Sequence, residues 1–245
     1  MIATENLGKR YGDKTVLSGI PLTLPKKKII AFIGGNGTGK STLLSLITRT
    51  LSKTEGKVTV GGLELAGWNN RELAKKLSIL RQTNDLNIRL TVRELVGFGR
   101  FPHTRGRLNP EVERQIDTAL DYLELKPLDN RDRVELSGGQ RQMAFIAMII
   151  AQDTEYVFLD EPLNNLDMRH SVQIMKVLRR LVAEAGKTVM VVIHDINFVA
   201  SHADYVIALK GDTPAMIRPD VLKRIYDMDI QVAEIGGRPV CLYYS

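Results

Sequence analysis

The chain contains one cysteine and no long apolar run. Cys241 is the only cysteine among 245 residues, so no internal disulfide can form, which fits a reducing compartment. The longest apolar stretches, such as TVMVVI at 188–193, are far shorter than the roughly 20 residues of a membrane-spanning helix. The N-terminal MIATENLGKRYG has no apolar signal segment, so we expect it to belong to the mature protein.

The remaining composition is that of an ordinary soluble protein, with 44% apolar and 25% charged residues and neither repeats nor low-complexity tracts. The net charge of +6 comes from basic residues scattered among acidic ones. The run at 26–28 is expected in a solvated turn before a strand. A mild positive bias suits a nucleic acid or an anionic membrane face. Charge alone therefore leaves both classes of partner open.

The hydrophobic pattern predicts an α/β core interrupted by helices. We expect strands at 2–6, 15–24, 57–64, 155–160, 188–195 and 204–209, a strand–turn–helix unit at 28–47, a helix and a strand within 71–80, and helices around 168–185 and near 219–226. The whole chain is then a single domain, 1–245. Within it, residues 1–84 and 153–245 form the α/β core and 85–152 a helical subdomain.

Helix-start signals support the helical middle of the chain. Thr91 and Glu94 have the spacing of a capping box. Asn109-Pro110 is typical of an N-cap followed by a first-turn proline. One face of the helix that follows carries Val112, Ile116, Ala119 and Leu123.

A glycine-rich segment predicts a phosphate site. GGNGTGKS at 34–41 follows the pattern G-x-x-x-x-G-K-[ST] and lies between an apolar strand and a helix. Glycines let successive backbone N–H groups curl around an anion, and a helix N-terminus adds its dipole. Lys40 can then reach the outer phosphates, and the hydroxyl of Ser41 can bind Mg²⁺.

Two carboxylates end a predicted strand, YVFLDE at 156–161. Ligands in open α/β sheets bind at such strand ends. Asp160 is suited to hold Mg²⁺ through its water shell, and Glu161 could polarise a water against the γ-phosphate. A third strand ends at His194, which could donate to the same phosphate. No role is assigned to the other histidines, His103, His170 and His202.

A second helix start also exposes backbone N–H groups. LSGGQRQMAFIAMIIAQD at 136–153 begins with Ser-Gly-Gly and continues as a helix with an apolar face. That face comprises Met143, Ile146, Ala147, Ile150 and Ala151. Ser137 is a good N-cap, and Gly138 and Gly139 leave the first-turn N–H groups uncovered. If two copies pack head to tail, each nucleotide could lie between the glycine-rich loop of one copy and this mouth of the other.

The order of these motifs resembles a known family. LSGGQ at 136–140, preceded by the phosphate loop and followed by FLDEP at 158–162, looks like the signature of ATP-binding-cassette (ABC) ATPases, over essentially the whole chain. The resemblance implies an α/β P-loop NTPase fold with a mixed sheet core, an antiparallel N-terminal β subdomain and a helical signature subdomain. It also implies that two subunits sandwich two MgATP molecules.

The resemblance assigns roles to residues that otherwise look like surface positions. Tyr11 matches the aromatic that stacks on adenine, Gln82 the glutamine that touches Mg²⁺ and reports to the transmembrane partner, and Asp167 the loop that crosses the dimer. The implied catalytic residues are Glu161, His194 and Gln82, and the implied metal-binding residues are Ser41, Gln82 and Asp160. The implied nucleotide-binding set is Tyr11, Gly34, Gly35, Asn36, Gly37, Thr38, Gly39, Lys40, Ser41, Thr42, Ser137, Gly138, Gly139, Gln140 and Asp167.

The departures from the family pattern are few. Gly35 stands where the family usually has proline, and Met143 replaces a common arginine on the signature helix. After Lys210, the stretch GDTPAMIRPD at 211–220 shortens the usual Asn-Gly hairpin. These changes concern loop rigidity and C-terminal strand pairing more than the ATP site.

Subfamily features point to import of an iron chelate. Residues 72–108 are similar to ATPases of importers for ferric siderophores, haem and cobalamin, and FGRFPHTRGRL (98–108) and EPLNNLDMRHSVQIMKVLRRL (161–181) look closest to the ferric-siderophore branch. The implied protein lies on the cytoplasmic face of the membrane, where ATP closes a head-to-tail dimer and hydrolysis reopens it. Its implied partners are permease subunits facing the residues after Gln82, a second copy and, through the permease, a substrate-binding lipoprotein, with no nucleic acid.

Other functions remain open from the sequence. They are a haem or cobalamin importer, a soluble cassette ATPase acting on nucleic acid or the ribosome, and an exporter or lipoprotein-release ATPase. The soluble class usually carries two cassettes or long insertions, and this chain has neither. The sequence does not identify the transported compound, because the motor subunit does not contact it.

Overall fold

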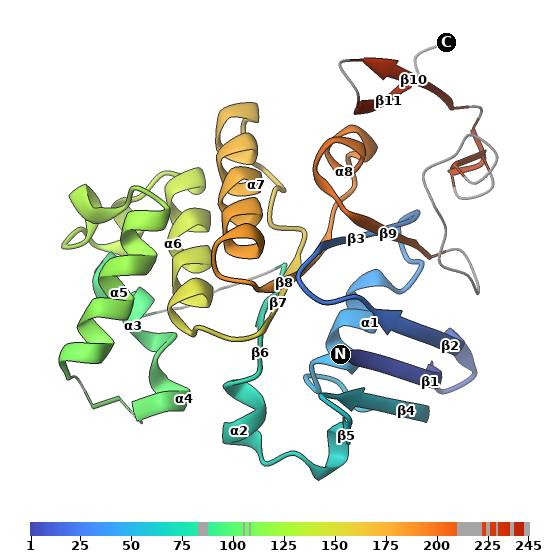
Figure 1. Ribbon diagram of the computed structural model, residues 1–245, viewed down its shortest axis with the longest axis horizontal. Helices are drawn as coiled ribbons and strands as arrows, with labels where there is room; N and C mark the ends of the chain where they lie inside the picture. The colour runs from blue at the N-terminus through green and yellow to red at the C-terminus, as the bar shows by residue number, and fades with distance from the viewer. Residues whose placement is uncertain are drawn as a thin grey trace. The chain divides into compact units, whose positions relative to one another are not determined.

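The computed structural model describes residues 1–82, 88–104, 106–107, 109–209, 222–223, 226–228, 230–235 and 238–242 (Figure 1). The chain divides into two compact units, the first comprising 1–68 and 188–245 and the second 69–187. The segment 85–152, expected to be a helical subdomain, falls inside the second unit. The domain boundaries given above remain predictions.

The first unit begins with an antiparallel sheet (Figure 1). Its strands are β1 (Ile2–Tyr11), β2 (Lys14–Leu24), β4 (Glu55–Val60) and β5 (Leu63–Glu64), in the order β2-β1-β4-β5. Along the end of β2, buried Ile20, Leu22 and Leu24 alternate with exposed residues, as expected of a sheet with one covered face. The strands predicted at 2–6 and 15–24 are confirmed, whereas the one at 57–64 is broken by the turn at Gly61-Gly62.

A parallel group of strands forms the rest of the first unit's framework. β3 (Ile29–Ile33) pairs in parallel with both β8 (Thr188–Val192) and β9 (Tyr205–Ala208). Every residue of β3 and β8 is buried, which explains their uninterrupted apolar sequences. The helix predicted after β3 is α1 (Lys40–Ile47), so the strand–turn–helix unit at 28–47 is confirmed.

Three elements of the first unit were not predicted, one helix and two strands. α8 (Ile196–His202) begins at the N-cap Asp195, whose carboxylate accepts from the backbone N–H groups of Asn197 and Phe198. β10 (Gln231–Ile235) pairs antiparallel with β11 (Arg238–Leu242). The Asn197 side chain accepts from the backbone N of Cys241 at 2.7 Å and donates to its carbonyl at 3.2 Å, which fastens β11 to α8. The shortened segment 211–220, and most of the helix expected near 219–226, lie outside the described residues.

The second unit holds two parallel strands and a cluster of helices. β6 (Leu77–Leu80) pairs with β7 (Tyr156–Asp160), and α2 (Asn70–Ala74) precedes β6. The remaining helices are α3 (Val92–Phe98), α4 (Phe101–Thr104), α5 (Pro110–Tyr122), α6 (Gly138–Ala151) and α7 (Met168–Ala183). α3, α5 and α6 pack against one another. No helix in the described ranges is long and apolar enough to cross a membrane.

The predicted helix starts of the second unit are confirmed. Thr91 and Glu94 form a capping box in both directions, and the Asn109 side chain accepts from the backbone N of Val112 with Pro110 in the first turn. The predicted apolar face of α5 is buried, with Val112, Ile116, Ala119 and Leu123 each at most 2% exposed. The amphipathic pattern therefore determines how α5 meets its neighbours.

Helices α3 and α6 approach closely at Gly99. A Cβ on Gly99 would overlap the carbonyl oxygen of Met148, whereas a Cβ on Gly97 would make an ordinary 3.5 Å contact with Ile116 Cδ1. The backbone of Gly99 lies in the right-handed region. Glycine is therefore required at 99 because there is no room for a Cβ, and not because the backbone adopts a conformation that favours glycine.

These two glycines give a matched pair of variants. Gly99→Ala should lower the free energy of unfolding by about 1–3 kcal/mol, because the added methyl group forces α3 away from α6. Gly97→Ala should raise it by roughly 0.5–1 kcal/mol, since alanine is the better helix former. Denaturant titrations of both variants measure the difference. Equal effects of the same sign would contradict the close approach.

Candidate functional site

The glycine-rich loop of the first unit is shaped by close backbone approaches. Gly34 has φ 147° and Gly39 φ 92°, conformations that favour glycine. A Cβ on Gly34 would lie 2.5 Å from the carbonyl oxygen of Leu209, and one on Gly39 would lie 2.7 Å from Leu17 Cδ2. At Gly35, where the family usually has proline, the nearest atom to a Cβ would be Thr38 Cγ2 at 3.8 Å. Packing therefore requires glycine at 34 and 39 but not at 35.

Lys40 is held inside this loop. Its side chain is buried, and Nζ donates to the carbonyl oxygens of Gly34 at 2.9 Å and Gly35 at 2.8 Å. Lys40 and Ser41 are the first residues of α1, and the first backbone N–H groups of a helix have no partner within the helix itself. The loop thus gathers a cation and N–H donors at one helix N-terminus, which suits an anion.

Two carboxylates stand at the carboxyl end of β7 in the second unit. Asp160, the last residue of β7, is buried, and Glu161 follows with φ 53°. A non-glycine residue in this left-handed region carries backbone strain, which recurs at functional sites. The chain therefore leaves the extended conformation directly after Asp160.

Two amide groups converge on one oxygen of Glu161. Gln82, two residues beyond the end of β6, donates from Nε2 to Glu161 Oε2 at 2.7 Å. Asn164 Nδ2 donates to the same oxygen. Gln82 reaches Glu161 because parallel strands β6 and β7 end at the same edge. The carboxylate is therefore held from two sides by neutral donors.

Asn164 was missed in the sequence. Its signal was available: an amide three residues after an acidic strand end can fold back across the intervening turn. Gln82, expected as a catalytic and metal-binding residue, contacts Glu161 directly. Because its amide nitrogen faces Glu161, its carbonyl oxygen is the atom suited to a cation.

The signature mouth, residues 137–140, is the start of helix α6 and carries an N-terminal cap. Ser137 is the N-cap of α6, its Oγ accepting from the backbone N of Gln140 at 3.3 Å, while Gln140 Oε1 accepts from the backbone N of Ser137 at 3.1 Å. The Ser-x-x-Gln spacing of a capping box is a signal that the sequence reading left unused. Met143 is buried on the apolar face, as predicted.

The two signature glycines face different surroundings. Among the described residues, nothing lies within 4 Å of a Cβ placed on Gly138, whereas a Cβ on Gly139 would meet the ring of His170 at 3.1 Å. Packing within the described part of the chain therefore does not require glycine at 138. His170, which received no role from the sequence, lies against Gly139.

The other expected residues lie at exposed positions. Asp167 is the N-cap of α7 and accepts from the backbone and the ring of His170, hydrogen bonds that lower the pKa of Asp167. Tyr11 ends β1 with its ring half-exposed and the Lys9 ammonium 4.8 Å from its centre. His194 follows β8 and is exposed.

The expected site residues divide between the two units. The first unit carries Tyr11, the loop and helix start from Gly34 to Thr42, and His194. The second carries Gln82, Asp160, Glu161, the mouth from Ser137 to Gln140, and Asp167.

The oxygen donors present fit Mg²⁺ better than a metal that prefers thiolate or imidazole ligands. In the described ranges, no group of three or more His, Cys, Asp or Glu side chains could hold a metal ion, so they contain no all-protein cage of that kind. A hydroxyl, a carboxylate and an amide carbonyl suit Mg²⁺, which binds few protein ligands and completes its shell with water and phosphate oxygens.

Residues 17–164 match a family model described as ABC transporter. The chain belongs to the ABC transporter family. Its sequence is 50% identical to the petrobactin import ATP-binding protein YclP of Bacillus subtilis (strain 168), covering 100% of both chains. It is 40% identical to the iron(3+)-hydroxamate import ATP-binding protein FhuC of the same organism, covering 100% of this chain and 95% of that one. This cassette is accordingly an ATPase that binds ATP.

Solved structures agree with the fold. A putative metal-chelate type ABC transporter in an inward-facing conformation superposes with a TM-score of 0.83 at 27% identity, covering 99% of this chain and 98% of that chain. The dimeric post-hydrolysis state of the cassette MJ0796, bound to ADP and Pi, gives a TM-score of 0.77 at 31% identity, covering 89% and 99%. The predicted ABC fold is therefore confirmed.

Removing the second amide donor tests the geometry around Glu161. Asn164→Ala should lower kcat for ATP hydrolysis roughly tenfold, since a hydrogen bond to a charged group is worth about 1.5–3 kcal/mol. The KM for ATP should stay the same, because Asn164 contacts Glu161 and not the glycine-rich loop. Steady-state ATPase assays separate the two parameters. A raised KM at unchanged kcat would show that Asn164 acts elsewhere.

Proposed function

We propose that this cassette is the ATP-hydrolysing subunit of a membrane importer for ferric siderophores. The observation that carries the substrate class is the end-to-end similarity to siderophore import ATP-binding proteins, at 50% identity for YclP and 44% for the petrobactin import ATP-binding protein FatE of Bacillus anthracis. The hemin import ATP-binding protein HmuV of Pseudomonas fluorescens is 35% identical. The higher similarity favours siderophores over haem.

Residues of both units have separate roles in ATP binding and hydrolysis. Tyr11 stacks on adenine, the backbone N–H groups from Gly34 to Thr42 cradle the phosphates, and Lys40 compensates the outer phosphate charge. Glu161, oriented by Gln82 and Asn164, accepts a proton from the attacking water. His194 donates to the γ-phosphate.

Mg²⁺ would be held by Ser41, Asp160 and the carbonyl oxygen of Gln82. When bound, it supplies charge neutralisation on the β- and γ-phosphate oxygens.

A second copy of the chain completes each nucleotide site. In the mouth formed by Ser137, Gly138, Gly139 and Gln140, the capping box binds the N–H groups of Ser137 and Gln140, so the first-turn N–H groups proposed to meet an anion are those of Gly138 and Gly139. Gly138 also faces open space in the described structure. We infer that the γ-phosphate held by one copy is covered by the mouth of the other, with Asp167 in the loop between them. ATP then closes a head-to-tail dimer, and hydrolysis reopens it.

A groove in the second unit suits the permease. It has a volume of about 460 Å³ and is lined by residues of α3, α4 and α5, including Phe98, Phe101 and Ile116. Phe98 and Phe101 are 51% and 57% exposed, and such apolar side chains beside a groove mark interaction sites. We propose that a permease segment with an apolar side chain occupies this groove on the cytoplasmic face of the membrane. A substrate-binding lipoprotein would act through the permease, and no nucleic acid is involved.

Two variants separate ATP binding from dimer closure. Glu161→Gln should bind ATP but nearly stop turnover, leaving a stable ATP dimer, because the proton acceptor is lost while the mouth is intact. Ser137→Arg should bind ATP as a monomer without hydrolysing it, because the larger side chain blocks the mouth. Sedimentation with ATP and phosphate-release assays measure both. Wild-type turnover in Ser137→Arg would refute the two-copy site.

The proposed docking groove predicts a variant that binds the permease weakly but keeps its basal ATPase activity. Phe101→Ser should weaken permease binding roughly tenfold or more, as truncation of a central aromatic anchor does. Basal ATPase activity of the isolated cassette should stay unchanged, because Phe101 lies outside the nucleotide-binding set. Leu63→Ser, at another exposed apolar residue, is the matched control. Equal permease affinity for both variants would place the docking surface elsewhere.

The import function has a direct test. Cells with and without this cassette should differ in uptake of iron supplied as petrobactin-type or hydroxamate chelates, and the cassette should co-purify with a polytopic permease. Haem or cobalamin uptake that depends on the cassette, with iron-chelate uptake intact, would replace the siderophore assignment. Co-purification with ribosomes or DNA would replace the importer itself.

A further inference from the structure

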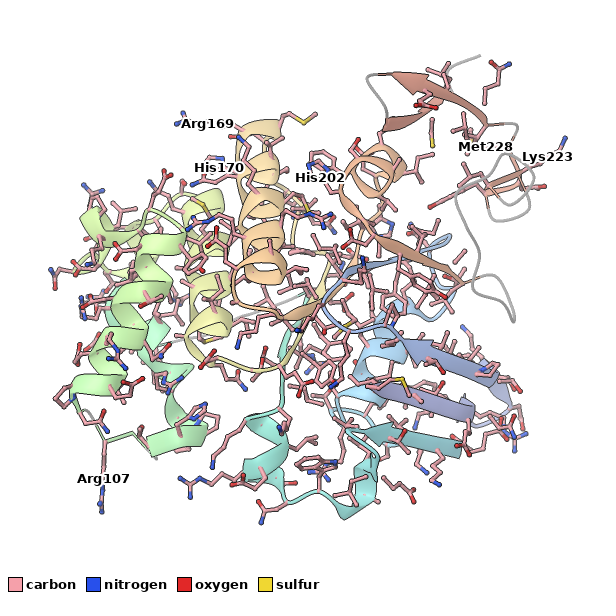
Figure 2. The ribbon with its side chains drawn as sticks, in the orientation of Figure 1. Arg107, Arg169, His170, His202, Lys223 and Met228 are labelled. Atoms are coloured by element: carbon pink, nitrogen blue, oxygen red, sulfur yellow. The ribbon has the colours of Figure 1, made fainter. Side chains whose placement is uncertain are left out.

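One histidine contacts both functional loops of the second unit. His170, in the first turn of α7, points toward α6, as Figure 2 shows. Its Nδ1 lies 2.8 Å from Asp167 Oδ2, and its backbone N donates to Asp167 Oδ1, also at 2.8 Å. Because a carboxylate only accepts, Nδ1 carries the proton. Both oxygens of Asp167 are therefore held by the same residue.

The other contact of His170 is with the signature mouth. A Cβ on Gly139 would lie 3.1 Å from Cγ and 3.2 Å from both Cδ2 and Cε1 of the ring. Three nearly equal distances mean that the face of the imidazole, rather than its edge, covers Gly139. Such distances are shorter than ordinary carbon contacts, so this face position is available only because residue 139 is glycine.

We propose that His170 is a positioning residue that links Asp167 to the signature mouth, so that both meet the nucleotide and the second subunit as one preformed surface. The inference rests on the proposed head-to-tail dimer. It also explains the two signature glycines separately: Gly138 leaves room outside this chain, whereas Gly139 leaves room for His170.

The exposure of Asp167 explains why its hydrogen bonds with His170 would affect dimerisation. The Asp167 side chain is 62% exposed, and a lone exposed side chain has many rotamers to lose when a partner arrives. The two hydrogen bonds from His170 lower the pKa of Asp167 and fix its orientation before binding. Preorganisation of this kind raises affinity by reducing the ordering cost at the moment of association.

Two substitutions each break one half of the link. His170→Phe keeps a flat ring over Gly139 but cannot donate to Asp167. His170→Asn places an amide nitrogen near the position of Nδ1 but has no ring to cover Gly139. His202→Asn is the matched control, because His202 stacks on Phe198 in α8 of the first unit and has no assigned role in the site.

The experiment measures ATP-dependent dimerisation in the Glu161→Gln background. In His170→Phe the ATP concentration for half-dimerisation should rise roughly tenfold, the effect of one lost hydrogen bond to a charged group. In His170→Asn it should also rise, because the ring that covers Gly139 is lost. ATP affinity of the monomer and the melting temperature should match those of Glu161→Gln alone. His202→Asn should leave all three quantities unchanged. A purely structural role would instead lower the melting temperature and ATP affinity together.

The outcomes distinguish this inference from the proposed function. If Glu161→Gln itself stays monomeric with ATP, the head-to-tail dimer is wrong and the inference falls with it. If Glu161→Gln dimerises and both folded His170 variants dimerise equally well, the inference alone is overturned. Should His170→Phe fail to fold, His170→Asn decides the matter.

A double-mutant cycle adds a second criterion. In the Glu161→Gln background, the losses of Asp167→Ala and His170→Phe should not add, because both remove the same side-chain hydrogen bond. Additive losses would show that His170 does not act through Asp167 and would overturn the inference.

Discussion

The proposed function depends on helix N-termini whose first backbone N–H groups can meet an anion. A helix leaves these donors without internal partners, and the capping box of α6 covers the N–H groups of Ser137 and Gln140 but does not involve those of Gly138 and Gly139. Here one such start lies in each unit, at α1 and at α6. Both open with glycine, but for different reasons. Gly34 and Gly39 are required by atoms of this chain, whereas Gly138 has no such requirement in the described structure, which is why a second subunit is the natural explanation for it.

The acidic end of β7 shows how the fold orients Glu161, the proposed base. Asp160 is buried at the end of the strand, whereas Glu161 follows it with a left-handed backbone, so the two neighbouring carboxylates have different surroundings. The donors Gln82 and Asn164 come from the end of the adjacent strand and from the following turn. Backbone strain and two hydrogen bonds thus meet at the same residue, a combination that recurs at functional sites.

The sequence predicted what is local and missed what is brought together over distance. Periodicity and capping rules predicted the features that depend on residues only a few positions apart. These features are the phosphate loop, the caps at Thr91, Asn109 and Ser137, and the apolar face of α5. The contact of His170 with Gly139 joins residues on different helices and has no pattern of its own. Asp195 and Ser-x-x-Gln at 137–140 were local signals that could have been used for α8 and for the capping role of Gln140.

Helix α6 connects the proposed docking groove with the signature mouth. Its N-terminus is the mouth at Ser137, and its C-terminal end is bound by the segment that carries Phe101. Arg100 donates to the carbonyl of Ala151 at 2.7 Å, and His103 Nε2 lies 2.9 Å from the carbonyl of Gln152. Burial lowers the pKa of both side chains, so these contacts sit in a partly dry environment where hydrogen bonds are stronger. A helix of 14 residues is about 21 Å long and bends little. α6 thus joins the proposed docking groove at one end to the N–H groups at its other end, the groups proposed to cover the partner's γ-phosphate.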